Sequence, residues 1–134
     1  MNDKKIIRVR DVMKTKFDTV DGTDTVAQAL DTMAHVETKT LIVRKRHVDD
    51  TIGIVVLADI SRQVLAKDRA PDRVNIYEIM SKPVLTVSPD MDIRHCARLF
   101  ARFGLARGPV VEDGEVIGVV SLTDMVVKGM VPYL

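Results

Sequence analysis

Cysteines, long apolar runs and an excess of charge are all scarce in this sequence, and each absence excludes a class of protein. The only cysteine, Cys96, excludes an internal disulfide framework and fits a reducing compartment. No stretch approaches the roughly 20 apolar residues that span a bilayer, and no long apolar run follows the N-terminal residues. The net charge of +1 gives no field that would attract nucleic acid or a membrane surface. We therefore expect a cytoplasmic protein.

What the sequence does contain is enough apolar material for one compact core. Of its 134 residues, 46% are hydrophobic and 29% are charged, which is typical of an ordinary globular domain rather than a disordered chain.

An internal repeat is the most informative feature of the chain. Residues 118–124, Gly-Val-Val-Ser-Leu-Thr-Asp, are an imperfect copy of residues 53–59, Gly-Ile-Val-Val-Leu-Ala-Asp, which lie 65 positions earlier. Earlier in each copy the offset is 67, so two extra residues fall in the polar stretch 45–51 of the first copy. Self-similarity over this distance indicates one supersecondary unit used twice.

Each copy has the periodicities of a β-α-β-β-α unit. Apolar residues recur at helical spacing over 26–36 and 93–103, and a second short helix is expected to begin near Asp59 and near Asp124. Short β-branched runs predict a hairpin in each copy, the second one turning at residues 112–115. The expected N-caps are Thr23 or Asp24 for the first long helix and Ser88 or Asp90 for the second.

The two copies predict two repeats in one globule. We place them at residues 8–67 and 74–131, with the charged, proline-containing stretch 68–73 as a linker. Since neither repeat buries much surface alone, we expect an α+β fold in which the repeats pack sheet to sheet with pseudo-twofold symmetry.

These features together resemble the tandem CBS (cystathionine-β-synthase) domain family, over about residues 9–130. The resemblance rests on the openings Asp-Val-Met at 11–13 and Glu-Ile-Met at 78–80, the Thr-Val pairs, and the Gly-x-x-Ser-x-Thr-Asp ending at 118–124. It implies a disc-like Bateman module, whose two clefts bind adenosine-containing ligands.

The resemblance also assigns roles to single residues. It makes Asp124 the partner of the ribose hydroxyls, Ser121 and Thr123 contacts of a phosphate, and Arg107 the charge that neutralises it. A carboxylate accepts hydrogen bonds from two vicinal hydroxyls, free amides at a helix start favour phosphate, and the arginine fork suits phosphate oxygens. The remaining residues that the resemblance places around the base are Val84, Leu85, Pro109, Asp24 and Ala29.

The first copy departs from this pattern. It keeps Asp59, but apolar side chains replace both hydroxyls, and Thr40 stands where the second copy has Arg107. Lys39, next to it, could supply charge. The sequence therefore predicts a principal site at Asp124 and a weaker second site formed by Asp59, Lys39 and Thr40.

Other interpretations remain open. The polar residues at 121–124 could simply cap the last helix. The row Arg94, Arg98 and Arg102, and the basic run 44–47, are expected to be solvated surface, with a phosphate or partner role for the row and nucleic-acid contact for the run as alternatives. The histidines show no metal-ligand spacing, so no metal site is expected.

No motif for a nucleophile, a metal or a cofactor is present, so the chain is not expected to be an enzyme. The leading hypothesis is a stand-alone sensor that binds AMP, ADP or ATP as a regulatory ligand, with or without Mg²⁺, and regulates another protein as a homodimer. Nucleic acid and membranes are not expected partners. Two alternatives stay open: an interaction module with a vestigial site, and a binder of S-adenosylmethionine.

Overall fold

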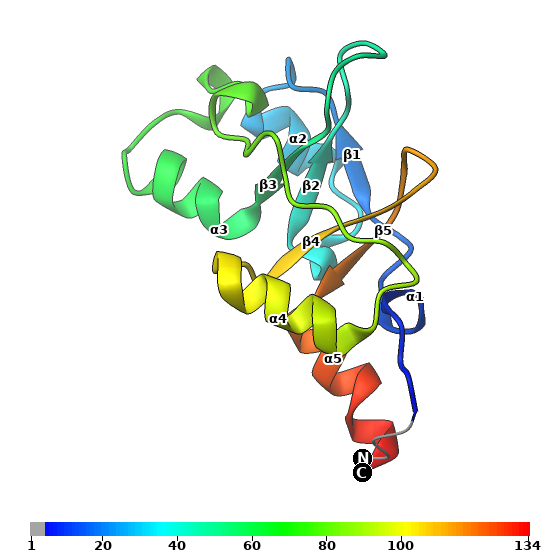
Figure 1. Cartoon of the computed structure of the whole chain (residues 1–134). Helices are drawn as coiled ribbons and strands as arrows, with labels where there is room; N and C mark the ends of the chain where they lie inside the picture. Colours follow the sequence, from blue (N-terminus) through cyan, green and yellow to red (C-terminus); the bar gives the residue numbers. More distant parts are fainter. Residues whose placement is uncertain (1–4) are drawn as a thin grey trace. The chain divides into compact units, whose positions relative to one another are not determined.

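The computed structural model describes residues 5–134 (Figure 1). The chain forms two compact units. Unit 1 joins the N-terminal segment through Thr15 to residues 85–134, and unit 2 comprises residues 16–84. Among the described residues, no helix is both long enough and apolar enough to cross a membrane.

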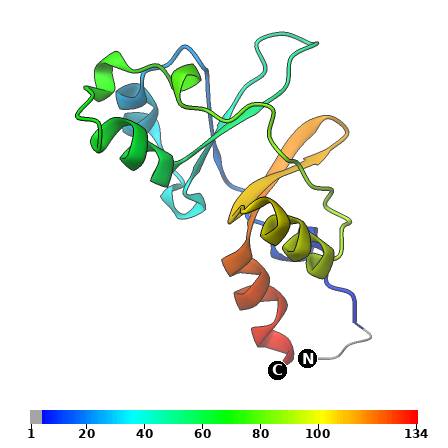
Figure 2. The same ribbon diagram turned by 60° about the vertical axis from the view of Figure 1, so that its left-hand side comes forward.

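Unit 2 is built on a three-stranded sheet in the order β1-β2-β3. β1 runs parallel to β2 through the α2 crossover, and β2 runs antiparallel to β3. The long loop between β2 and β3 projects from this sheet (Figure 2). Leu41, Val55 and Ile76 have no exposed surface and form the centre of the core. The elements are β1 (Asp18–Val20), α2 (Val26–Thr32), β2 (Thr40–Val43), β3 (Gly53–Val56), α3 (Leu57–Ile60), a π-helical continuation (Ser61–Leu65), and 3₁₀ turns at Val36–Thr38, Pro71–Arg73 and Ile76–Glu78.

Unit 1 is built on an antiparallel hairpin. Asp113 and Gly114 at its turn have φ of 52° and 79°, the left-handed pair that a tight hairpin requires, so the predicted turn is confirmed. Val9, Phe100 and Val120 lie fully buried in its core. The elements are α1 (Val9–Val12), α4 (Ile93–Phe103), β4 (Arg107–Glu112), β5 (Glu115–Ser121), α5 (Leu122–Gly129) and a 3₁₀ turn at Val131–Tyr133.

The opening segment of each repeat joins the body of the other repeat. Lys14 exchanges two backbone hydrogen bonds of 2.9 Å with Val119 on β5 of unit 1. Ser81 exchanges bonds of 3.0 and 2.8 Å with Ile54 on β3 of unit 2. Lys14 and Ser81 correspond at the 67-residue offset, and the two strand residues correspond at 65. Both units therefore have the same construction.

The predicted helices and hairpins are confirmed, but the predicted N-caps of both long helices are wrong. The caps are Thr25, whose hydroxyl accepts from the Gln28 amide, and Asp92, which accepts from the Arg94 amide. The two sets of predicted caps close the preceding turns instead. The Asp24 carboxylate accepts from the Asp21 amide, and the Ser88 hydroxyl accepts from the Asp90 amide.

The first strand predicted for the second copy is also shorter than expected. Of the Thr86-Val87 pair, only Val87 joins the sheet, through a single parallel bridge to Val110. Pro89 follows two residues later and has no amide hydrogen to extend a ladder.

Candidate functional site

The strand-to-helix turn between β5 and α5 holds most of the predicted site. Ser121 ends the strand and caps the helix, its hydroxyl accepting from the Asp124 amide at 3.1 Å. The capping interpretation is thus confirmed for Ser121. Leu122 donates its amide to the Ala106 carbonyl at 2.9 Å, which ties the turn to the start of β4. Thr123 is exposed on the first helical turn.

Asp124 is buried and ion-paired. Only 6% of the residue is exposed, and its Oδ2 lies 2.5 Å from Lys14 Nζ. Lys128 Nζ lies 4.0 Å from the other oxygen. A carboxylate taken out of water needs such a partner, because an unpaired buried charge is costly. The predicted ribose anchor is therefore held by a lysine that sequence reasoning did not place in the site.

Lys14 reaches Asp124 because Gly118 lets the N-terminal segment cross β5 closely. A Cβ at position 118 would lie 2.8 Å from both the Lys14 carbonyl oxygen and the Met13 sulfur, closer than real Cβ contacts allow. The signal in the sequence was the pair Met13-Lys14 opposite Met80-Ser81 in the other copy. This difference could be interpreted only from the structure, in which the opening segment of each repeat packs against the body of the other repeat.

The other predicted residues of unit 1 lie along β4 and before it. Arg107 starts β4, is half-buried, and stands opposite Ser121 in the hairpin register. Pro109 is buried, and its carbonyl accepts from the Val87 amide at 3.2 Å. Leu85 is partly buried against the core of the unit. Unit 1 thus gathers an acid, two hydroxyls and three cations around the turn from β5 into α5.

Three predicted residues belong to unit 2. Val84 is half-buried, Asp24 is engaged in its own turn, and Ala29 is 1% exposed in the core of that unit. Their part in an Asp124 pocket stays a prediction.

The corresponding turn of unit 2 is chemically different. Asp59 pairs with Arg62 at 2.8 Å on an exposed face of the helix, and its side chain is 32% exposed against 9% for Asp124. Thr40 is fully buried, and its hydroxyl bonds to that of Thr38 at 3.3 Å. Lys39 is exposed, and its carbonyl accepts from the Leu57 amide.

The chain is similar to a known protein family and to several individual proteins. A family model described as the CBS domain matches residues 9–66 and 76–129. The uncharacterized protein MK0525 of Methanopyrus kandleri is 37% identical over 87 residues, or 64% of this chain, and the match covers only 43% of that protein's length. The hexameric CBS-CP12 protein from bloom-forming cyanobacteria has a similar structure, with a TM-score of 0.88 and 34% identity over 93% of this chain and 72% of that one. The CBS domain pair of protein MJ0100, solved with 5′-methylthioadenosine and S-adenosyl-L-methionine, gives a TM-score of 0.74 and 24% identity over 90% of this chain and 94% of that one.

Proposed function

Because this chain belongs to the CBS domain family, as a pair of CBS domains, we propose that it is a regulatory module that binds an adenine nucleotide at Asp124. Occupancy would stabilise whichever arrangement of the chain binds the nucleotide better, and a partner protein would read that arrangement.

The observation that carries this proposal is the Lys14–Asp124 pair. A carboxylate has about four acceptor positions, so Asp124 can hold Lys14 and still accept from ribose hydroxyls. Lys14 in turn brings a positive charge to the place where a phosphate would follow the ribose. The exposed Thr123 hydroxyl on the first turn of α5 adds a donor for the same phosphate.

The charges favour a nucleotide over S-adenosylmethionine. Lys14 and Arg107 both lie at this end of the hairpin, and two cations attract a phosphate but repel a sulfonium. The MJ0100 pair was solved with a sulfonium ligand and a neutral thioether, which share only the adenosine part with AMP. We therefore assign the adenosine part to Asp124 and the selectivity for phosphate to Lys14 and Arg107.

A regulatory role suits the chemistry of the described residues better than catalysis. Cys96, the only thiol, is fully buried, and burial raises its pKa to about 11, so it is not an available nucleophile.

The test is a thermal-shift panel of AMP, ADP, ATP, S-adenosylmethionine and 5′-methylthioadenosine on the wild type and on Asp124→Ala. A ligand at about 100 times its dissociation constant should add roughly 2.7 kcal/mol of stability. We expect the nucleotides to stabilise the wild type most and to lose that effect in the variant. No shift with any adenosyl compound would favour a purely structural module instead.

We further propose that the chain pairs with a second copy through α5. Val126, Val127, Met130 and Val131 are between 40% and 54% exposed, an apolar surface that a monomer rarely leaves open. The CBS-CP12 relative is itself described as hexameric. Light scattering should show a dimer that Val127→Glu dissociates and that the control Val48→Glu, in the exposed hairpin loop, does not; a monomeric wild type would contradict this.

A further inference from the structure

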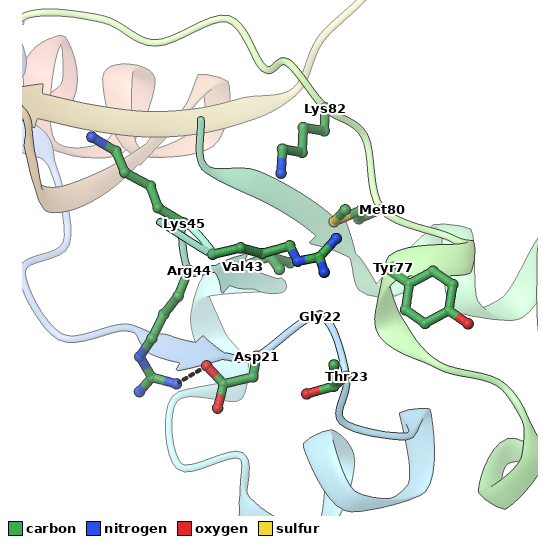
Figure 3. Close-up of a pocket in the computed structure, with 10 residues that line it drawn as sticks. Asp21, Gly22, Thr23, Val43, Arg44, Lys45, Tyr77, Met80 and Lys82 are labelled. Carbon is green, nitrogen blue, oxygen red and sulfur yellow. Dashed lines mark hydrogen bonds and ion pairs between the residues drawn. The ribbon is translucent and has the colours of Figure 1, made fainter. Parts of the chain in front are cut away.

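Unit 2 has a cleft at the end of its sheet opposite to Asp59. The cleft has a volume of about 690 Å³, within the range of about 300–1,000 Å³ typical of small-molecule sites. It lies between the loop that precedes α2, the start of the β2–β3 loop, and the segment 77–82. Figure 3 shows Lys82 and Met80 on one side of the cleft and Asp21 and Thr23 on the other.

The walls of this cleft carry an excess of positive charge. The lining residues include four cations and a single carboxylate, that of Asp21, which pairs with Arg44 at 3.1 Å (Figure 3). Lys82 pairs at 2.6 Å with Asp50, which does not itself line the cleft. Within residues 5–134, neither Lys45 nor Arg46 has an ion-pair partner for its side chain. Two cations are thus available to a ligand.

Hydrogen bonds between the walls hold the cleft in shape. Asp50 accepts both Lys82 Nζ and the Arg46 amide, the latter at 2.8 Å, and so ties the loop to the 77–82 segment. These bonds, led by the one from Lys82, hold the pKa of Asp50 well below its usual range. Tyr77 donates its amide to the Gly22 carbonyl at 3.0 Å and fixes the third wall. A preformed site of this kind loses little entropy when it binds.

The same place in unit 1 has no excess of positive charge. At the 67-residue offset, Arg10 replaces Tyr77, Asp90 replaces Thr23 and Glu112 replaces Lys45. Arg10 lies between the two acids, 2.8 Å from Asp90 and 3.1 Å from Glu112. One fold position thus carries an ion cluster of one cation and two acids in unit 1 and an excess of cations in unit 2, so the positive charge is not a requirement of the fold.

We propose that the unit 2 cleft binds a small molecule that carries two or more phosphate groups, at a site separate from Asp124. Arg46 offers a fork and Lys45 a point charge for phosphate oxygens, while Arg44 and Lys82 hold the walls and add to the field. Tyr77, which is 55% exposed, and Met80 give one wall an apolar surface for the rest of the ligand.

Calorimetric titration with inorganic pyrophosphate tests this proposal, because pyrophosphate has no ribose for Asp124 to bind. We expect the double variant Lys45→Ala/Arg46→Ala to bind at least about tenfold more weakly than the wild type. The double variant Lys67→Ala/Arg73→Ala removes the same charge from exposed positions of unit 2 outside the cleft and should leave the affinity unchanged. Asp124→Ala should also retain binding, and Lys45→Glu, which copies the unit 1 residue, should weaken it.

Three outcomes would overturn the proposal. The first is no binding of pyrophosphate, or equal weakening in both double variants. The second is loss of binding in Asp124→Ala with full binding in Lys45→Ala/Arg46→Ala, which would place the anion at the nucleotide site. The third is tight binding of a single-stranded oligonucleotide with none of pyrophosphate, which would make this a nucleic-acid surface. All variants are first compared with the wild type by urea unfolding.

Discussion

At the scale of single residues, Lys14 distinguishes the two strand-to-helix turns. It stands beside a buried carboxylate in unit 1, whereas Ser81, its counterpart in unit 2, is exposed, and Asp59 is served by its helical neighbour Arg62. The two strand-to-helix turns therefore differ in charge as well as in hydroxyl groups.

Replacing Lys14 should change which ligand the protein prefers. We expect Lys14→Met to lower the affinity for AMP by about tenfold or more, because a charge-assisted contact is lost, and to change the affinity for S-adenosylmethionine much less. Titration calorimetry with both compounds measures the ratio. Ser81→Ala is the matched control and should change neither affinity. An unaltered ratio in Lys14→Met would remove this lysine from the ligand's surroundings.

The positions of the site residues could be predicted from the sequence only within one hairpin and the turn that follows it. The positions of Asp124, Ser121 and Thr123 at one turn follow from the repeat, and the register brings Arg107 opposite. Lys14 is 110 positions away from Asp124, and only the folded unit brings the two together. Whether these residues bind a nucleotide remains a prediction.

At the scale of elements, the turn into α5 separates capping from binding. Ser121→Ala removes the N-cap and should lower the free energy of unfolding by about 1 kcal/mol. Thr123 is exposed and lies two positions further along, so Thr123→Ala should leave the free energy of unfolding nearly unchanged while it weakens the binding of the nucleotide. Urea unfolding and AMP titration of both variants measure the two effects. Equal destabilisation by both substitutions would contradict the assignment of the cap.

The loop between β2 and β3 should make stability depend on pH through Asp50. The pKa of Asp50 is depressed in the folded chain, chiefly by Lys82, from its ordinary value of 3.8. Its contribution is thus fully present above that value and is lost progressively as the pH falls below it. Urea unfolding of the wild type and Asp50→Asn at a series of pH values should show a gap that closes in acid. A gap independent of pH would rule out the depressed pKa.

Element types were more predictable than their ends. A periodicity of 3.6 residues predicted the long helices, and short β-branched runs separated by polar turns predicted both hairpins. The predicted caps were wrong because the side chains of Asp24 and Ser88 accept hydrogen bonds in the turns just before the helices. Thr25 and Asp92 therefore cap the helices instead. Local hydrogen bonds of equal quality compete at such positions, and the sequence does not rank them.

At the scale of the whole molecule, the repeats in the sequence are not the compact units of the structure. Val9 and Val12, from the first repeat, lie fully buried in the core that α4, β4 and β5 of the second repeat build. Periodicity detects repeats, but it does not say which segments complete which core.

This organisation predicts where a core substitution is felt. Val12→Ala should cost about 2 kcal/mol and speed amide hydrogen exchange over residues 107–129, far away in sequence, more than over residues 40–56. Val74→Ala, at an equally buried position of unit 2, is the matched control and should show the opposite pattern. Faster exchange over 40–56 in Val12→Ala would mean that the opening segment completes the core of its own repeat.

The most direct test of the central claim is calorimetric titration of AMP into three proteins: the wild type, Asp124→Ala and Asp59→Ala. AMP has a single phosphate, so the polyphosphate cleft of unit 2 contributes least to the signal. We predict one site per chain in the wild type, lost in Asp124→Ala and retained with similar affinity in Asp59→Ala. Binding that survives in Asp124→Ala and disappears in Asp59→Ala would contradict the account.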